Sequence, residues 1–189
     1  MAQEIRAALP DMPIILGGYF PSSVYRLLLE KYPFITAIVR GDGEAAALQI
    51  SSSLARGRSF LSARSPNLAW LDGGEIRTTP VQPVALDNLP ILDFRLLRNS
   101  SCYQTVNLMT SRGCPFHCNY CLESSMRPYA TYPLAWVARQ LAHIESELPN
   151  THISISDSLF GVGRKRTLEM CQVMGEHRFT YGVESRVDV

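Results

Sequence analysis

The stretch Thr110-Ser111-Arg112-Gly113-Cys114-Pro115-Phe116-His117-Cys118-Asn119-Tyr120-Cys121 decides how this 189-residue sequence is interpreted. It holds three of the chain's five cysteines, spaced Cys-x3-Cys-x2-Cys. A disulfide scaffold spreads its cysteines in pairs, whereas a tight cluster of this kind predicts a metal site in a reducing compartment.

Iron–sulfur and zinc are the two metal sites that such a cluster can form. Three thiolates on one loop hold three corners of a 4Fe-4S cluster and leave the fourth iron open to another ligand. Structural zinc takes four ligands, usually from two separated cysteine pairs. His117 is available as a fourth zinc ligand, but its place beside Cys118 strains a tetrahedron with all three thiolates. The spacing therefore favours iron–sulfur. Cys102 and Cys171 are expected to be buried thiols and not ligands.

The sequence around this stretch alternates strand and helix patterns. A strand is expected just before it and two more after it, each followed or preceded by a helix with one apolar face. The expected elements are a strand at 105–109, a helix at 133–148, a strand at 151–156, a helix at 164–177 and a strand from 179 to about 183. This alternation of strands and helices predicts an α/β fold with parallel strands.

The N-terminal third also alternates strand and helix patterns. Two apolar runs, at 12–16 and 37–40, each end in glycines and lead into helices at about 22–31 and 44–56. A hairpin is predicted at 67–78 around Gly73-Gly74, and a proline-rich stretch follows. We therefore expect a partial domain at 1–60, a hairpin and connector at 61–104, and a second α/β part at 105–189.

Composition excludes several classes of function. The formal charge of +1 is too small for nonspecific electrostatic binding to nucleic acid or to an anionic membrane. No apolar run approaches the roughly 20 residues of a spanning helix, and the N-terminus does not resemble a signal peptide. A cytoplasmic protein without a nucleic-acid partner is expected.

The cysteine stretch closely resembles the signature of radical S-adenosylmethionine enzymes, in which the open iron binds the cofactor's amino and carboxylate groups. Its Ser-Arg-Gly-Cys-Pro-Phe start is similar to the subgroup with an N-terminal cobalamin-binding domain. The upstream runs Ile15-Leu16-Gly17-Gly18 with Pro21, and Val39-Arg40-Gly41-Asp42-Gly43-Glu44, resemble the last two strand-and-loop units of that domain, and Leu89-Pro90 with Asp93-Phe94 resembles its link to the barrel.

The resemblance implies a fold and a set of site residues. The fold is the C-terminal part of a Rossmann-like cobalamin-binding domain followed by the first half of a partial (β/α)6 barrel. Cluster ligands would be Cys114, Cys118 and Cys121. Residues implied to contact S-adenosylmethionine are Tyr120, Asp157, Glu184 and Arg186. Residues implied to contact cobalamin are Gly17, Gly18, Gly41, Gly43 and Glu44. The Asp-x-His-x-x-Gly motif that supplies a lower axial histidine is absent.

The function implied is reductive cleavage of S-adenosylmethionine, starting radical chemistry on an unactivated carbon, with cobalamin-dependent methyl transfer as the favoured outcome. A cobalamin-independent rearrangement or cyclisation enzyme, and a non-catalytic iron–sulfur or zinc module, are the alternatives. Partners would be a small-molecule or lipid-like substrate and an electron donor such as flavodoxin or ferredoxin. Fewer strands are predicted than either domain of the family contains. We therefore expect the chain to be an internal piece of a longer protein and to be inactive on its own.

Overall fold

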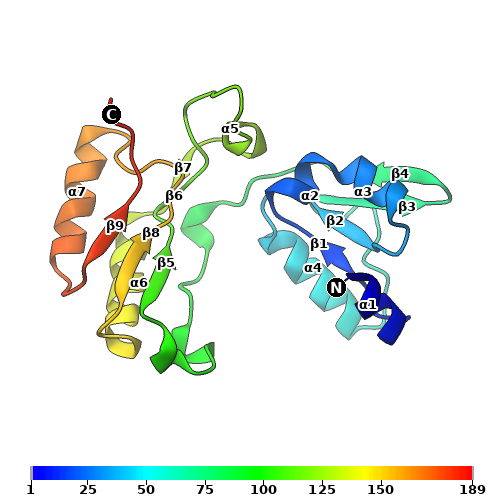
Figure 1. The fold of residues 1–189 in the computed structure, drawn as a ribbon, viewed down its shortest axis with the longest axis horizontal. Coiled ribbons are helices and arrows are strands. Elements are labelled where there is room, and N and C mark those ends of the chain that lie inside the picture. The colour runs from blue at the N-terminus through cyan, green and yellow to red at the C-terminus, as the bar shows by residue number, and fades with distance from the viewer. Residues whose placement is uncertain (1, 189) are drawn as a thin grey trace. The chain divides into compact units, whose positions relative to one another are not determined.

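The computed structural model describes residues 2–188, and the chain divides into two compact units between Val84 and Ala85. Each unit contains its own sheet with helices packed beside it (Figure 1). Parallel strand pairs occur in both units, so the predicted α/β class is confirmed.

The first unit is a mixed four-stranded sheet with helices on both faces. Its strands, in sheet order, are β1 (Ile15–Leu16), β2 (Ala37–Val39), β3 (Leu68–Asp72) and β4 (Glu75–Thr78), and its helices are α1 (Ala2–Ala8), α2 (Tyr19–Ser23), α3 (Tyr25–Lys31) and α4 (Glu44–Ala55). Strands β1 and β2 are parallel, whereas β3 is antiparallel to both of its neighbours.

Strand β2 is the centre of the first unit's core. All three of its residues are buried, as predicted for a strand covered on both faces. Ala37 and Val39 pack in one cluster with Ile50 of α4, whereas Ile38 packs in another with Leu29 of α3. Successive residues of a strand point to opposite faces. Helices α3 and α4 therefore cover opposite faces of the sheet.

The predicted hairpin forms β3 and β4, and it extends the sheet of the first unit, with Ile38 opposite Ala69. The side chain of Asn67 holds the start of the hairpin in place. Its amide nitrogen donates to the Asp42 carbonyl at 2.7 Å, and its amide oxygen accepts from the Gln82 N–H at 2.7 Å. The segment expected to hold a hairpin and a proline-rich connector, 61–104, is divided in the structure, with its hairpin in the first unit and its residues from 85 onward in the second.

The second unit contains a parallel sheet in the order β5-β8-β9, made of β5 (Thr105–Leu108), β8 (His152–Ile155) and β9 (Tyr181–Val183). Its helices are α5 (Glu123–Met126), α6 (Leu134–Glu147) and α7 (Arg164–Gly175), with a small ladder of β6 (Ser111–Arg112) and β7 (Ala130–Thr131), and 3-10 turns at Leu86–Asn88, Phe94–Leu96 and Ser100–Cys102. The three strands and two long helices predicted after residue 105 are confirmed.

Helix α6 packs on two sides. Its apolar stripe, which includes Val137, Leu141 and Ile144, is fully buried. The indole N–H of Trp136 donates to the Leu89 carbonyl at 2.9 Å, and the Gln140 amide both accepts from and donates to the backbone of Leu92. The end of the proline-rich stretch, around Leu89 and Leu92, therefore lies along α6 as part of the second unit. Among residues 2–188, no helix is long and apolar enough to cross a membrane.

An acid-sensitive contact joins α6 to the segment after α7. Glu145 Oε2 lies 2.9 Å from His177 Nδ1, and Oε1 accepts the Arg178 N–H at 3.1 Å. These hydrogen bonds favour the charged carboxylate, so the pKa of Glu145 lies below its ordinary value of 4.5.

This contact predicts a pH-dependent stability. A carboxyl group whose pKa is lowered by folding stabilises the protein above its unfolded pKa, and that contribution is lost as the pH falls through the folded value. Between about pH 6 and about pH 3, the thermal midpoint of the wild type should therefore fall more steeply than that of Glu145→Gln. Parallel curves for the two proteins would contradict the prediction.

Candidate metal centre and cofactor pocket

The three clustered cysteines lie on an excursion that we call the cysteine loop, residues 113–129. The loop is closed at its base by the β6–β7 ladder, which we call the stem, with Ser111 opposite Thr131 and Arg112 opposite Ala130. Strand β5 leads directly into this stem. The loop therefore leaves the sheet at the carboxyl end of β5, where parallel α/β folds place their ligands.

Gly113 closes the base of the cysteine loop. Its φ is +77°, a conformation that favours glycine. A Cβ atom at this position would lie 2.8 Å from the Pro128 carbonyl oxygen and 3.0 Å from that of Arg127. Only a residue without a side chain lets the two legs of the loop approach this closely.

Gly113→Ala is therefore expected to separate the legs of the loop and to reduce iron uptake several-fold, because the positive φ costs about 1–3 kcal/mol and the backbone clash adds to it. Iron content after anaerobic reconstitution, together with the thermal midpoint, measures the effect. Gly57→Ala is the matched control, since Gly57 lies outside the candidate site and has a φ of +62° but no atom within 4 Å of the added Cβ. Equal iron content in both variants would show that the close approach is unimportant.

All three cysteines of the loop are free thiols. Cys114 and Cys118 are half-buried and Cys121 is exposed, and a backbone hydrogen bond of 3.0 Å from Cys121 N–H to the Cys118 carbonyl forms a turn between the last two. In the described part of the chain, no three His, Cys, Asp or Glu side chains already converge as a metal-binding group. The assignment of the three cysteines as cluster ligands stays a prediction.

The residues expected to contact S-adenosylmethionine lie in different surroundings. Tyr120 is 88% exposed on the cysteine loop. Asp157 lies two residues beyond β8 and is buried, with both carboxylate oxygens bonded to Thr110 and Ser111 before the loop. Glu184 follows β9; its carbonyl accepts the Phe160 N–H at 2.8 Å.

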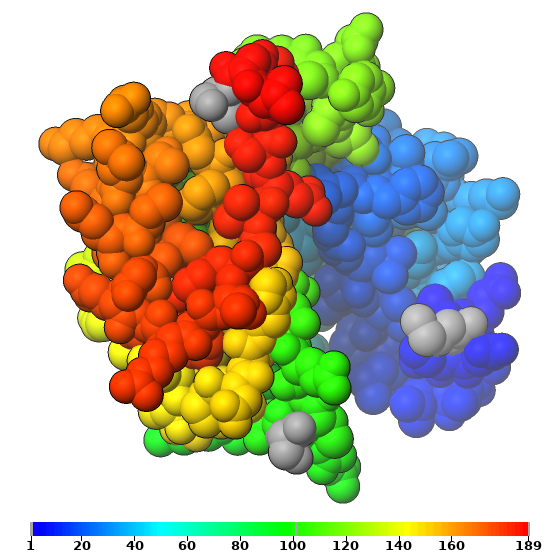
Figure 2. Space-filling view, turned by 60° about the vertical axis from the view of Figure 1, so that its left-hand side comes forward, coloured from blue at the N-terminus to red at the C-terminus, as the bar shows by residue number. Residues whose placement is uncertain are grey.

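Arg186 lies against the cysteine loop. Its guanidinium carbon is 4.1 Å from the centroid of the Phe116 ring, and in Figure 2 the red C-terminal residues meet the yellow-green loop. Two hydrogen bonds, of 2.8 and 2.6 Å, join it to the Asp188 carboxylate. This pairing raises the pKa of Arg186 and lowers that of Asp188. The second unit thus brings the end of β9 and the cysteine loop into contact.

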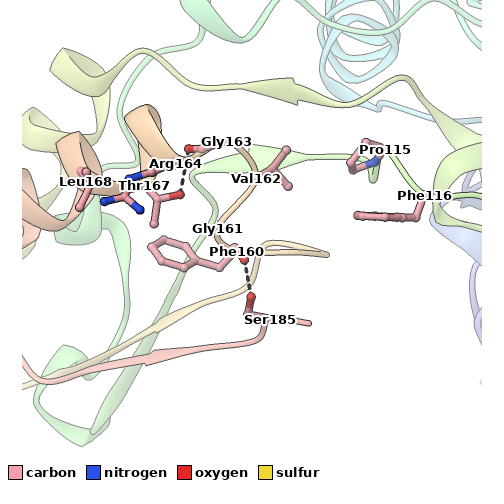
Figure 3. A pocket seen from close by; sticks show the side chains of 10 residues that line it. All are labelled: Pro115, Phe116, Phe160, Gly161, Val162, Gly163, Arg164, Thr167, Leu168 and Ser185. Atoms are coloured by element: carbon pink, nitrogen blue, oxygen red, sulfur yellow. Dashed lines mark hydrogen bonds between the residues drawn. The ribbon is translucent and has the colours of Figure 1, made fainter. Parts of the chain in front are cut away.

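A cavity of about 750 Å³ lies beside the cysteine loop. Figure 3 shows Pro115 and Phe116 of the loop on one side and the segment after β8 on the other. The Ser185 hydroxyl donates to the Phe160 carbonyl at 2.7 Å, which ties the end of β9 to this segment. The lining residues are Pro115, Phe116, Phe160, Gly161, Val162, Gly163, Arg164, Thr167, Leu168 and Ser185.

Sequence reasoning missed most of the cavity wall. The pair Gly161 and Gly163, in the loop between β8 and α7, was a visible signal, because loops that follow parallel strands form the edge where ligands bind. Both glycines have positive φ, +100° and +82°, so they form turns. Phe160 and Ser185 gave no signal in the sequence, since only tertiary hydrogen bonds bring them together: the Phe160 N–H donates to the Glu184 carbonyl and the Ser185 hydroxyl donates to the Phe160 carbonyl.

The glycines expected to contact cobalamin gather at one edge of the first unit's sheet. Gly17 and Gly18 follow β1, whereas Gly41 and Gly43 follow β2, and these strands are parallel neighbours. Glu44 is the first residue of α4. The hydroxyl of Ser22, which sequence reasoning missed, accepts the Gly41 N–H at 3.1 Å and links the two loops.

The expected burial of the two remaining cysteines is wrong, because both Cys102 and Cys171 are exposed. In α7, the buried face carries Met170 and Met174, which are one turn apart. Cys171 lies about 100° around the helix from Met170, and so faces away from that core.

No protein-family model matches the sequence. An uncharacterized methyltransferase of Pyrococcus horikoshii is 26% identical over 166 residues, which cover 83% of this chain and 36% of the relative. An anaerobic magnesium-protoporphyrin IX monomethyl ester cyclase of Cereibacter sphaeroides is also 26% identical, over 94% of this chain and 31% of the relative. The chain therefore spans about a third of the length of these curated relatives.

The fold is also similar to a solved structure. The cobalamin-dependent S-adenosylmethionine radical enzyme OxsB, with aqua-cobalamin and S-adenosylmethionine bound, matches with a TM-score of 0.77 and 19% identity over 96% of this chain and 27% of that chain. The likeness in fold to OxsB thus confirms the predicted resemblance to radical S-adenosylmethionine enzymes of the cobalamin-binding subgroup, and the relatives in sequence are a methyltransferase and a cyclase.

Proposed function

We propose that this chain carries the 4Fe-4S site of a radical S-adenosylmethionine enzyme, with Cys114, Cys118 and Cys121 as the cluster ligands. The observation that carries the proposal is the place of the three free thiols, on one loop at the carboxyl end of β5 and beside a 750 Å³ cavity. Enzyme activity in general is supported by the relatives, which are a methyltransferase and a cyclase.

The donor set fits an iron–sulfur cluster. Thiolate is the ligand that these clusters require, and three thiolates leave one iron open. Structural zinc needs a fourth protein ligand, and exposed His117 is adjacent to Cys118 in the chain. A short loop with both ends fixed limits the positions that this imidazole can reach.

The chain's own residues prepare the surroundings of the site. When bound, the cluster and S-adenosylmethionine supply a 5′-deoxyadenosyl radical, the cofactors' own chemistry. Phe116, Phe160 and Val162 give the cavity an apolar wall on this side. Glycines 161 and 163 let backbone amides approach a ligand closely. We place the cofactor's adenosine in this cavity, near Tyr120, Glu184 and Arg186.

For the first unit we propose cobalamin binding at the edge formed by Gly17, Gly18, Gly41, Gly43 and Glu44. The parallel strands β1 and β2 bring both glycine loops to one edge, and OxsB, with a similar fold, binds aqua-cobalamin.

The resulting reaction would be methyl transfer to an unactivated carbon of a small or lipid-like substrate, with flavodoxin or ferredoxin as the electron donor. The cyclase relatives favour radical cyclisation as the second candidate.

Anaerobic reconstitution with iron and sulfide tests the proposal. About four irons per chain, and formation of 5′-deoxyadenosine when S-adenosylmethionine and a strong reductant are added, support the enzyme. A stable colourless zinc form without iron uptake would favour a non-catalytic module. Incubation with cobalamin, followed by gel filtration, separates the two enzymatic candidates, because a corrin absorption band that elutes with the protein requires a cobalamin site.

A further inference from the structure

Asp157 is bonded entirely to the residues that lead into the cysteine loop. Its side chain is 5% exposed, two residues beyond β8. One carboxylate oxygen accepts the backbone N–H groups of Thr110 at 2.6 Å and Ser111 at 2.9 Å. The other accepts the hydroxyls of the same two residues, at 2.6 and 2.8 Å. A single carboxylate thus fixes two consecutive residues at both backbone and side chain.

Arg166 of α7 also contacts Thr110, together with Tyr132 on the other leg of the stem. Its Nη2 donates to the carbonyls of Thr110, at 3.2 Å, and of Tyr132, at 2.7 Å. The Tyr132 N–H also donates to the Thr110 carbonyl at 3.0 Å. The two legs of the stem are therefore joined to each other and to α7. Thr110 and Ser111 are 3% and 2% exposed, so water does not compete for these bonds.

A carboxylate has about four lone-pair sites, and the four hydrogen bonds to Thr110 and Ser111 use them all. Binding the ammonium group of a cofactor would require breaking at least one of these short bonds. This geometry argues against the direct contact with S-adenosylmethionine that the sequence resemblance implies for Asp157.

We propose that Asp157 is a positioning residue of the metal site: it holds the stem of the cysteine loop against β8, and so sets where the three thiols stand relative to the cavity. The inference rests on the proposed function of the loop. A loop with a loose stem samples many directions, and ordering it around a metal costs conformational entropy. A stem fixed in advance removes that cost and keeps the ligands in one orientation.

Two substitutions separate positioning from cofactor contact. In Asp157→Asn the amide oxygen can accept both N–H groups and the amide nitrogen can donate to both hydroxyl oxygens, so the number of hydrogen bonds is preserved. In Asp157→Ala two buried N–H groups lose their acceptor. Ser158→Ala, an exposed position one residue further along, is the matched control. Thr110→Val removes one hydroxyl with little change of shape.

The first measurement is hydrogen exchange of the metal-free chain, followed in peptides covering 108–132 and 134–147. Asp157→Ala should exchange about tenfold faster in the first peptide, with little change in the second, whereas Asp157→Asn and Ser158→Ala should match the wild type. If the alanine variant fails to fold, Thr110→Val should still show a smaller acceleration. Unchanged exchange of residues 108–132 in both Asp157→Ala and Thr110→Val would overturn the proposal.

The second measurement follows iron content and the electron paramagnetic resonance spectrum of the reduced cluster, before and after addition of S-adenosylmethionine. Asp157→Asn should keep the iron and the cofactor-induced spectral change, whereas Asp157→Ala should lose most of its iron. An asparagine variant that keeps iron but loses the spectral change would overturn positioning in favour of direct contact. If the wild type binds no iron, the proposed function fails, and the exchange measurement still decides the role of Asp157.

Discussion

Replacement of Cys114, Cys118 or Cys121 by alanine is each expected to abolish the visible absorbance of the reconstituted protein and to reduce iron from about four atoms per chain to less than about one. The reason is that two thiolates do not hold a 4Fe-4S cluster against loss of iron. All three positions lie in one loop whose base is closed by the stem.

The chain provides its own controls for this experiment. Cys102→Ala and Cys171→Ala remove exposed thiols outside the cysteine loop, and both variants should keep the iron and the absorbance. Loss of the cluster in Cys171→Ala together with its retention in Cys121→Ala would show that the ligands are assigned wrongly.

Reconstituted alone, the 189-residue chain is expected to bind the cluster but to give far less 5′-deoxyadenosine than a version lengthened at both ends. The described part of the second unit has three parallel strands, whereas the barrel of the family that the chain resembles has about six. An incomplete barrel leaves a radical site open to water and does not hold the target carbon within reaction distance.

The comparison should be made with the two proteins at equal iron content, S-adenosylmethionine and strong reductant. Exposed apolar residues near the site, such as Tyr120 and Leu122, should also make the shorter chain aggregate more readily. Equal yields over multiple turnovers would contradict the expectation, because they would mean that these residues already enclose the reaction.

Local patterns in the sequence predicted the regular elements well. Helix α6 was expected at 133–148 and runs from Leu134 to Glu147, because its apolar residues recur at helical spacing. Strand β2 was expected from a short apolar run ending in glycine, and all its residues are buried. Such elements are set by neighbours a few residues apart, which the sequence displays directly.

Elements formed by distant partners were not predictable in this way. Strands β6 and β7 have two residues each, too few for any periodic pattern, and they exist because Ser111 meets Thr131. The hairpin was predicted, but its place in the first unit's sheet depends on Ile38 pairing with Ala69. The exposure of Cys171 likewise depends on which face of α7 is packed.

For the candidate site, the sequence by itself determined which three thiols lie on one loop, at Cys-x3-Cys-x2-Cys spacing, and predicted that they bind a cluster. Only the tertiary structure decided what fixes that loop. Asp157 and Thr110 are 47 residues apart and meet because β5 and β8 pair in parallel, which carries the ends of both strands to one edge. No local pattern encodes a contact of that kind, because it depends on strand pairing over a long separation in the chain.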